Sequence, residues 1–239
     1  MEVIFRVVAV MAFLGAALVL VMAREDAGTR RETAPGERSP RALLRAAITD
    51  LREALAIPEL RGVVIFLFWL QFGIGITNPL MELFVRDISE GDTAVVARTT
   101  GALFSAMAVV NLFAMPWWGS YGDRTGHTRA LMRCALLASA ALAMHSVVSA
   151  IALLFVCRVL LGAGMAGASP CAYGLAAAEL PLERRGGGMG LVFSARTLAI
   201  SLSAFSGGWL SQWVGIRGLF LAGAALVLFT LFGLWRRRA

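Results

Sequence analysis

The sequence contains no lysine, only two histidines and only three cysteines among its 239 residues. Cys134, Cys157 and Cys171 each lie in an apolar stretch without a Cys-x-x-Cys pair, so neither a disulfide nor a metal site is expected. The triple glycine at 186–188 lacks the lysine and the flanking strand of a phosphate-binding loop. No nucleophile stands in a pattern with a general base. We therefore predict no catalytic residue, no metal, no cofactor and no enzyme activity.

Apolar residues are abundant instead: they make up 59% of the chain, and the mean hydropathy is +0.76. A soluble domain of this size carries less apolar content. A helix needs about 20 apolar residues to cross a bilayer. Strand-like alternation is absent, which excludes a barrel, and backbone groups inside lipid must pair internally, so the apolar stretches are predicted to be helices. Seven such stretches occur, at 3–23, 61–85, 97–118, 129–148, 150–178, 187–210 and 217–235.

The 22 basic residues are all arginine, and they give a net charge of +7. In a soluble protein this excess would suggest nucleic acid, but here the arginines lie between the apolar stretches. Sixteen fall on alternate connections, within 24–61, 124–133, 184–185 and 236–238. The positive-inside rule places these connections and the C-terminus in the cytoplasm, with the N-terminus outside. We predict a protein whose partner is the lipid bilayer and that binds no nucleic acid.

The first 60 residues divide into an apolar stretch, 1–23, and a charged connection, 24–60. Residues 21–23 could instead end a signal peptide, but cleavage there would export the arginines of 24–60 and invert every later span. Residues 24–38 are polar and charged, and look flexible. An amphipathic helix is predicted over 39–57, with Ser39 as its cap and Pro40 in its first position. It would lie on the membrane surface or on the cytoplasmic helix ends, along an apolar stripe of Leu44, Ile48, Leu51 and Leu55.

The sequence contains an internal repeat. Residues 15–20 and 223–228 both read Gly-Ala-Ala-Leu-Val-Leu, each after a phenylalanine and before a basic end. The first span therefore resembles the last helix of an earlier six-helix unit, and we expect that unit to be missing from this chain.

The connection 119–129 resembles the cytoplasmic signature of the major facilitator superfamily, G-x-L-a-D-R-x-G-R-R. Tyr121 replaces the usual leucine, and His127 and Thr128 replace basic residues. The positions that match are Gly119, Asp123, Arg124, Gly126 and Arg129.

Several of these matched residues carry a readable physical role. Gly119 lets two helix ends approach closely. Asp123 can meet the positive end of a helix dipole, and Arg124 and Arg129 can pair with carboxylates on a neighbouring connection. We predict a conformational latch here, although a simple charged turn that fixes the topology is the alternative. The predicted cytoplasmic partner of this latch is the loop with Glu183, Arg184 and Arg185.

Two later segments extend the resemblance, since 158–162 is similar to the family's R-x-x-x-G and 181–196 to the connection and helix that follow it. The first span would be the sixth family helix and the rest the seventh to twelfth. The resemblance implies an all-α polytopic membrane protein with a six-helix bundle at 61–239, built from two three-helix inverted repeats. One transmembrane helix and a cytoplasmic linker would precede this bundle. The bacterial drug–proton antiporter branch is the most similar, which implies the bacterial plasma (inner) membrane.

In such folds the substrate lies near the bilayer midplane. Gln71 lies ten residues past Arg61, about 15 Å deep. Asn78 precedes Pro79, which is expected to kink its helix. Hydrogen bonds between helices remain the alternative role for Gln71 and Asn78. The other cavity candidates are Asn111, Tyr173 and two arginines inside spans, Arg158 and Arg196.

Two further patterns bear on transport. The span 187–210 carries small residues on one face, for which close helix packing is favoured over a cavity wall. They are Gly190, Ser194, Thr197, Ser201, Ala204 and Gly208. No acidic residue lies at mid-depth in any span, and Glu82 lies near an outer end, so a proton-coupling carboxylate would have to come from the other half of the fold.

The resemblance implies a secondary transporter that works by alternating access. We expect efflux of small amphipathic compounds with a proton as coupling ion. The alternatives are uptake of a sugar or an organic acid by the same fold, or a truncated fragment that does not transport. The expected partners are a small-molecule substrate and either the missing N-terminal half or a second half-transporter chain.

Overall fold

The computed structural model describes residues 56–89, 92–180 and 185–236, and isolated positions before them. Two compact units are present, residues 1–44 and 45–239. In the first unit, the described positions fall between Arg6 and Leu18 and are all helical, as predicted for the span 3–23. The flexible stretch 24–38, most of the amphipathic helix 39–57 and the loop residues 181–184 lie outside the described residues.

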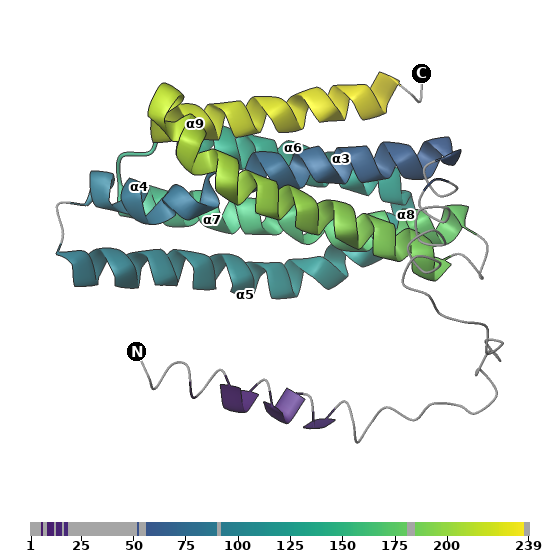
Figure 1. Cartoon of the computed structure of the whole chain (residues 1–239), viewed down its shortest axis with the longest axis horizontal. Helices are drawn as coiled ribbons and strands as arrows, with labels where there is room; N and C mark the ends of the chain where they lie inside the picture. The colour runs from purple at the N-terminus through teal and green to yellow at the C-terminus, as the bar shows by residue number, and fades with distance from the viewer. Residues whose placement is uncertain are drawn as a thin grey trace, which may run out of the picture. The chain divides into compact units, whose positions relative to one another are not determined.

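The second unit is built from helices, and its described residues contain no strand (Figure 1). The predicted all-α class is therefore confirmed. Within this unit, α5 lies on one side of the bundle and the second arm of α9 on the other (Figure 1). The elements are α3 (Pro58–Gly75), the 3-10 turn η2 (Asn78–Leu80), α4 (Met81–Ile88), α5 (Thr93–Thr125), α6 (His127–His145), α7 (Ile151–Ala166), α8 (Ala168–Glu179) and α9 (Arg185–Arg236).

The predicted kink at Pro79 is confirmed. α3 ends at Gly75, the Thr77 hydroxyl donates to the Ile74 carbonyl at 3.1 Å, and Pro79 lies inside η2 before α4 begins. Because proline has no backbone N–H, the chain continues at this point as a tighter turn rather than as one straight helix. The break places Asn78 on an irregular segment between two helices.

Glycine breaks the helical path at two other places, once inside a predicted span and once between two of them. The predicted span 150–178 consists of α7 and α8, which are separated by Gly167. A side chain at Gly167 would collide with the Cys134 sulfur and the Trp118 ring, so this turn needs the smallest residue. α9 bends at Gly215, where φ is +70°, a value that glycine adopts without strain. Its two arms correspond to the predicted spans 187–210 and 217–235.

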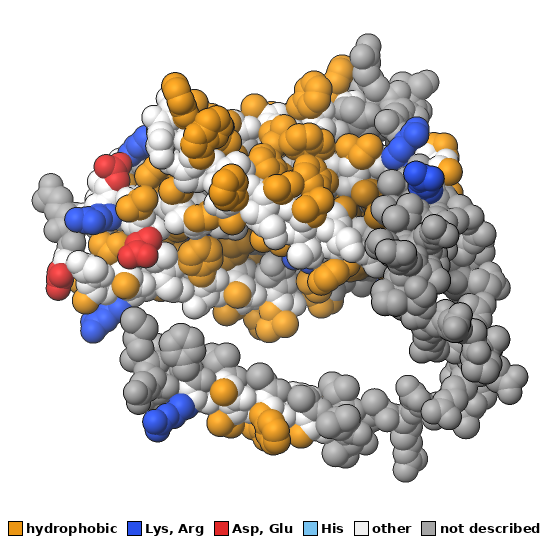
Figure 2. All heavy atoms as spheres, viewed as in Figure 1, with side chains coloured by type: hydrophobic (Ala, Val, Ile, Leu, Met, Phe, Trp, Pro, Cys, Tyr) orange, Lys and Arg blue, Asp and Glu red, His pale blue; other side chains and the backbone are white. Residues whose placement is uncertain are grey.

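Four helical segments in the described part of the chain are long and apolar enough to cross a membrane: Leu60–Ile88, Thr93–Thr125, Ile151–Ala178 and Arg185–Phe232. The last is long enough to contain two predicted spans. α6 is shorter, with Arg129 and Arg133 in its first two turns, and is not among the four. The surface between the charged ends of the second unit is largely hydrophobic (Figure 2). Such a surface suits lipid rather than water.

Close backbone contacts hold the bundle together. A Cβ added at Gly73 would lie 2.9 Å from the Gly223 carbonyl oxygen, so α3 and the second arm of α9 cross at two glycines. The Ser139 hydroxyl donates to the Ala224 carbonyl at 3.0 Å and ties α6 to the same arm. Phe84 and Phe220 pack with ring centroids 5.0 Å apart. Small residues at helix crossings are the usual means of packing helices in lipid.

Candidate functional site

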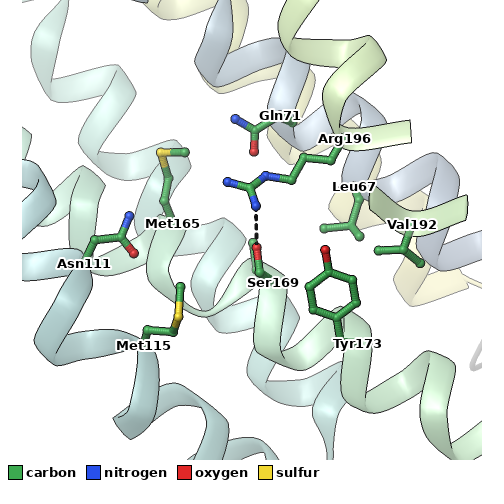
Figure 3. A pocket seen from close by; sticks show the side chains of 10 residues that line it. Leu67, Gln71, Asn111, Met115, Met165, Ser169, Tyr173, Val192 and Arg196 are labelled. Atoms are coloured by element: carbon green, nitrogen blue, oxygen red, sulfur yellow. Dashed lines mark hydrogen bonds between the residues drawn. The ribbon is translucent and has the colours of Figure 1, made fainter. Parts of the chain in front are cut away.

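A cavity opens where α3, α5, α7, α8 and α9 converge (Figure 3). Its empty volume, including the open mouth, is about 430 Å³. Four of the six predicted cavity residues meet here, although they lie far apart in the sequence. The lining residues are Leu67, Gln71, Asn111, Met115, Met165, Ala168, Ser169, Tyr173, Val192 and Arg196.

The polar side chains of the cavity are arranged around Arg196. The Arg196 guanidinium reaches in from α9 and donates to the Ser169 hydroxyl at 3.0 Å (Figure 3). The Tyr173 hydroxyl points toward the same space from α8, and Gln71 faces it from α3 (Figure 3). The side-chain amide oxygen of Asn111, Oδ1, is buried without a hydrogen-bond partner. Because a buried polar atom without a partner is costly, Asn111 is suited to accept a bond from a ligand.

The rest of the lining is apolar. Leu67, Ala168 and Val192 supply rigid walls, and Met115 and Met165 supply flexible, polarisable ones. Methionine adapts its shape to different ligands, and promiscuous binding surfaces use it for that reason. Arg196 is the only charged residue among those that line the cavity. The arrangement can therefore accept an amphipathic molecule whose polar end is neutral or negative.

Ser169 and both methionines are cavity residues that the sequence did not predict. Ser169 stands in the segment Gly167-Ala-Ser-Pro170, which interrupts an otherwise apolar stretch, and this interruption could have indicated it. Met115 and Met165 have no comparable signal, because a methionine in a lipid-spanning helix is ordinary. Only the convergence of α5 with α7 shows that they border the same space.

Arg158 and Asn78 do not line this cavity but bind each other elsewhere. Arg158 is completely buried on α7, and its Nη1 donates to the Asn78 Oδ1 at 3.3 Å. The six predicted residues therefore fall into two separate groups, four at the cavity and two at the break between α3 and α4.

The turn that resembles the family signature joins α5 to α6. Gly126 has a φ of +94°, and the Asp123 carboxylate lies 3.5 Å from the His127 Nε2. The predicted close approach at Gly119 is wrong, because a Cβ there would make an ordinary contact with Pro170 at 3.8 Å. The tight position is one turn later, at Gly122, where a Cβ would lie 2.7 Å from the His127 Nδ1.

The latch itself stays a prediction. The Asp123 side chain is 73% exposed, and Arg124 and Arg129 are exposed beside it. Of the predicted partner loop, Arg185 donates from Nε to the Leu180 carbonyl at 3.2 Å. Glu183 and Arg184 lie outside the described residues.

The face of small residues on the first arm of α9 does not pack closely within this bundle. Gly190, Ser194, Thr197, Ser201, Ala204 and Gly208 are all exposed, so the expectation of close packing is wrong for the part of the chain that is described. The opposite face is the buried one, with Ala199, Ser203 and Gly207. Periodicity identified a uniform face but could not say which side had a neighbour.

Comparison with known proteins adds independent information. The profile of the Major Facilitator Superfamily matches residues 64–239. Multidrug resistance protein MdtG of Proteus mirabilis is 29% identical over 160 residues, 67% of this chain and 39% of that protein. MdtG of Klebsiella pneumoniae is 28% identical over 158 residues, 64% of this chain and 38% of that protein. The uncharacterized MFS-type transporter YuxJ of Bacillus subtilis is 29% identical over 178 residues, 74% of this chain and 45% of that protein. The chain spans about two fifths of the length of these relatives.

Proposed function

The chain belongs to the Major Facilitator Superfamily, and on that premise we propose that it exports small amphipathic compounds across the membrane by alternating access. It is an integral membrane protein and not an enzyme, since the relatives are named as resistance proteins and as a transporter. Their names also agree with the resemblance to the drug-efflux branch. The observation that carries the proposal is the convergence of five helical segments on one cavity with a polar and an apolar side.

The cavity supports a more specific substrate class. Arg196 places one positive charge at its polar side, and no acidic residue is among the described residues that line it. In a site of low dielectric, an unpaired cation of the protein disfavours a cationic ligand and favours a negative or neutral one. We propose neutral and anionic amphipathic compounds as substrates of this half of the fold.

The open faces of α5 and of the first α9 arm support contact with a second half of the fold. Leu112, Phe113 and Trp117 on α5 are exposed, as are the small residues of the α9 arm. Alternating access requires one bundle to rock against another around a shared site. We propose that the cavity faces that second bundle, and that a proton-coupling carboxylate is supplied from there.

We propose that the chain lies in a bacterial inner membrane with its C-terminus on the cytoplasmic side, and the charge distribution supports this orientation. One end of the second unit carries arginine together with acidic residues, namely Glu82, Arg86, Asp87, Asp92 and Arg98. Arg217 lies at this end too, against Phe84 and Ser146. The other end includes three acids and five arginines among the described residues, namely Glu59, Asp123, Glu179, Arg61, Arg124, Arg129, Arg133 and Arg185. The more basic end is the cytoplasmic one by the positive-inside rule.

Transport into inside-out vesicles tests the proposed function. Vesicles from cells that express the gene should accumulate a neutral or anionic amphipathic dye when an inward-acidic proton gradient is imposed. Vesicles from cells with the empty vector, and vesicles whose gradient is collapsed by an uncoupler, serve as controls. Accumulation of a sugar or organic acid in right-side-out vesicles would indicate uptake instead. No gradient-dependent movement of any of these compounds would contradict the proposal.

A further inference from the structure

Arg158 is the largest fully buried side chain in the described part of the chain, with 0% of its surface exposed. It lies on α7, seven residues past Ile151, about 10 Å from the start of that helix. A guanidinium cannot lose its charge readily, so it remains a cation inside the bundle. A buried charge in a membrane protein is costly without a partner, and by default it marks a site.

The contacts of Arg158 are all neutral. Nη1 donates to the Asn78 Oδ1 at 3.3 Å and lies 3.7 Å from the Met107 sulfur. The guanidinium carbon lies 5.1 Å from the centre of the Phe104 ring. Nε and Nη2 are buried and have no hydrogen-bond partner. The site therefore satisfies one of the three guanidinium nitrogens and leaves the others with unused N–H groups.

No carboxylate of the described residues neutralises this charge. Glu82, Asp87, Asp92 and Asp123 are exposed, and none of them lies within 4 Å of the guanidinium. The ring of Phe104 gives only a weak electrostatic attraction compared with an anion. Arg158 therefore has unused N–H donors and a positive charge that no acid neutralises. A negatively charged ligand would satisfy both.

We propose that Arg158 and Asn78 form a binding site for a small anion with a single negative charge. The anion is either free, of the size of chloride, or the carboxylate of a bound compound. Nε and Nη2, which share one edge of the guanidinium, donate to it, while Asn78 accepts from Nη1 on the other side and holds the guanidinium in place. A doubly charged anion would leave an uncompensated negative charge in the same buried place, so it is disfavoured.

The surroundings of Arg158 give the anion a short path. Asn78 is half-buried on η2, at the break between α3 and α4, where no long helix holds it. Phe104 is 39% exposed on α5. Met107 is flexible and can move aside. The ring that contacts the guanidinium is thus itself partly exposed on α5.

This site is separate from the cavity around Arg196, and its test does not depend on transport. The purified full chain and its Arg158→Met variant are melted in lipid nanodiscs at constant ionic strength, with sulfate, chloride or acetate as the anion. Relative to sulfate, chloride or acetate should raise the apparent Tm of the wild type by about 5 °C more than that of Arg158→Met, when present at about 100 times its Kd. A response to chloride alone assigns a free inorganic anion, and an equal response to acetate assigns a carboxylate.

Two variants of this site and one control decide whether Arg158 causes the change of Tm with the anion. Arg158→Met should melt higher than the wild type in sulfate and should not gain stability when chloride replaces sulfate, because it removes an uncompensated charge. Asn78→Asp supplies a carboxylate beside the guanidinium and should likewise abolish the response, even if Arg158→Met fails to fold. Arg217→Met, at an exposed arginine, should respond as the wild type does. A change of Tm with the anion that is the same in the wild type and in Arg158→Met, or a full response in Asn78→Asp, would overturn the proposal.

Discussion

Replacing Arg196 by glutamine is expected to weaken binding of an amphipathic carboxylate to the purified chain by about 10- to 100-fold. A hydrogen bond to a charged group in a desolvated site contributes about 1.5–3 kcal/mol, and each 1.4 kcal/mol is a factor of ten in Kd. Among the described residues that line the cavity Arg196 alone is charged, so none of the others can replace its charge. Binding would be followed by fluorescence quenching of a labelled compound in nanodiscs.

The matched control for Arg196→Gln is Arg217→Gln. Arg217 donates from Nη1 to the Ser146 carbonyl at 3.2 Å and does not line the cavity. Its loss removes the same charge from the chain but should leave Kd unchanged. An uncharged analogue of the ligand should lose less affinity than the carboxylate in Arg196→Gln. Equal Kd values in the wild type and Arg196→Gln would show that the compound binds elsewhere.

Alanine at Gly126 is expected to destabilise the chain, whereas alanine at Gly119 is not. Gly126 has a φ of +94° between α5 and α6, where a residue with a side chain is strained by about 1–3 kcal/mol. For a chain of this size each kcal/mol shifts Tm by about 2–4 °C, so Gly126→Ala should melt about 3–10 °C lower. Thermal unfolding in detergent, followed by intrinsic fluorescence, measures the difference.

Gly119→Ala is the matched control for Gly126→Ala, because the same substitution is made at a glycine without a positive φ. A Cβ at Gly119 meets Pro170 at an ordinary 3.8 Å and requires no rearrangement. Gly119→Ala should therefore melt at the wild-type temperature or a few degrees above it, because alanine is favoured over glycine inside a helix by about 1 kcal/mol. If Gly126→Ala melted like Gly119→Ala, the backbone conformation at this turn would have no energetic importance.

Much of the fold follows from local chemistry that a sequence displays directly. Pro79 cannot donate a backbone hydrogen bond to a helix, so the amino-acid sequence by itself predicts the break there. The depth of Gln71 follows from the helical rise, and Gln71 does reach the cavity. The rarity of polar groups inside apolar stretches also indicated Asn111, Tyr173 and Arg196. In each case one residue and its position within one helix are sufficient.

Relations between helices were harder to predict. Arg158 and Asn78 are 80 residues apart, and nothing in either segment says that they bind each other. Gly119 and Gly122 lie one turn apart on α5, so the rotation of that helix decides which of them meets α6. The small-residue face of α9 has a clear period but no described neighbour. Such features depend on how helices are rotated and paired, which periodicity within a single helix does not determine.

We propose that the space among Gln71, Asn111, Tyr173 and Arg196 holds an amphipathic molecule. Photolabelling tests it most directly, with a neutral amphipathic diazirine probe, the purified chain in nanodiscs and peptide mapping by mass spectrometry. The account predicts label on Met115, Met165 and Val192, which an excess of unlabelled compound removes. Label confined to outward-facing positions such as Phe205 and Phe229, and unaffected by competitor, would contradict it.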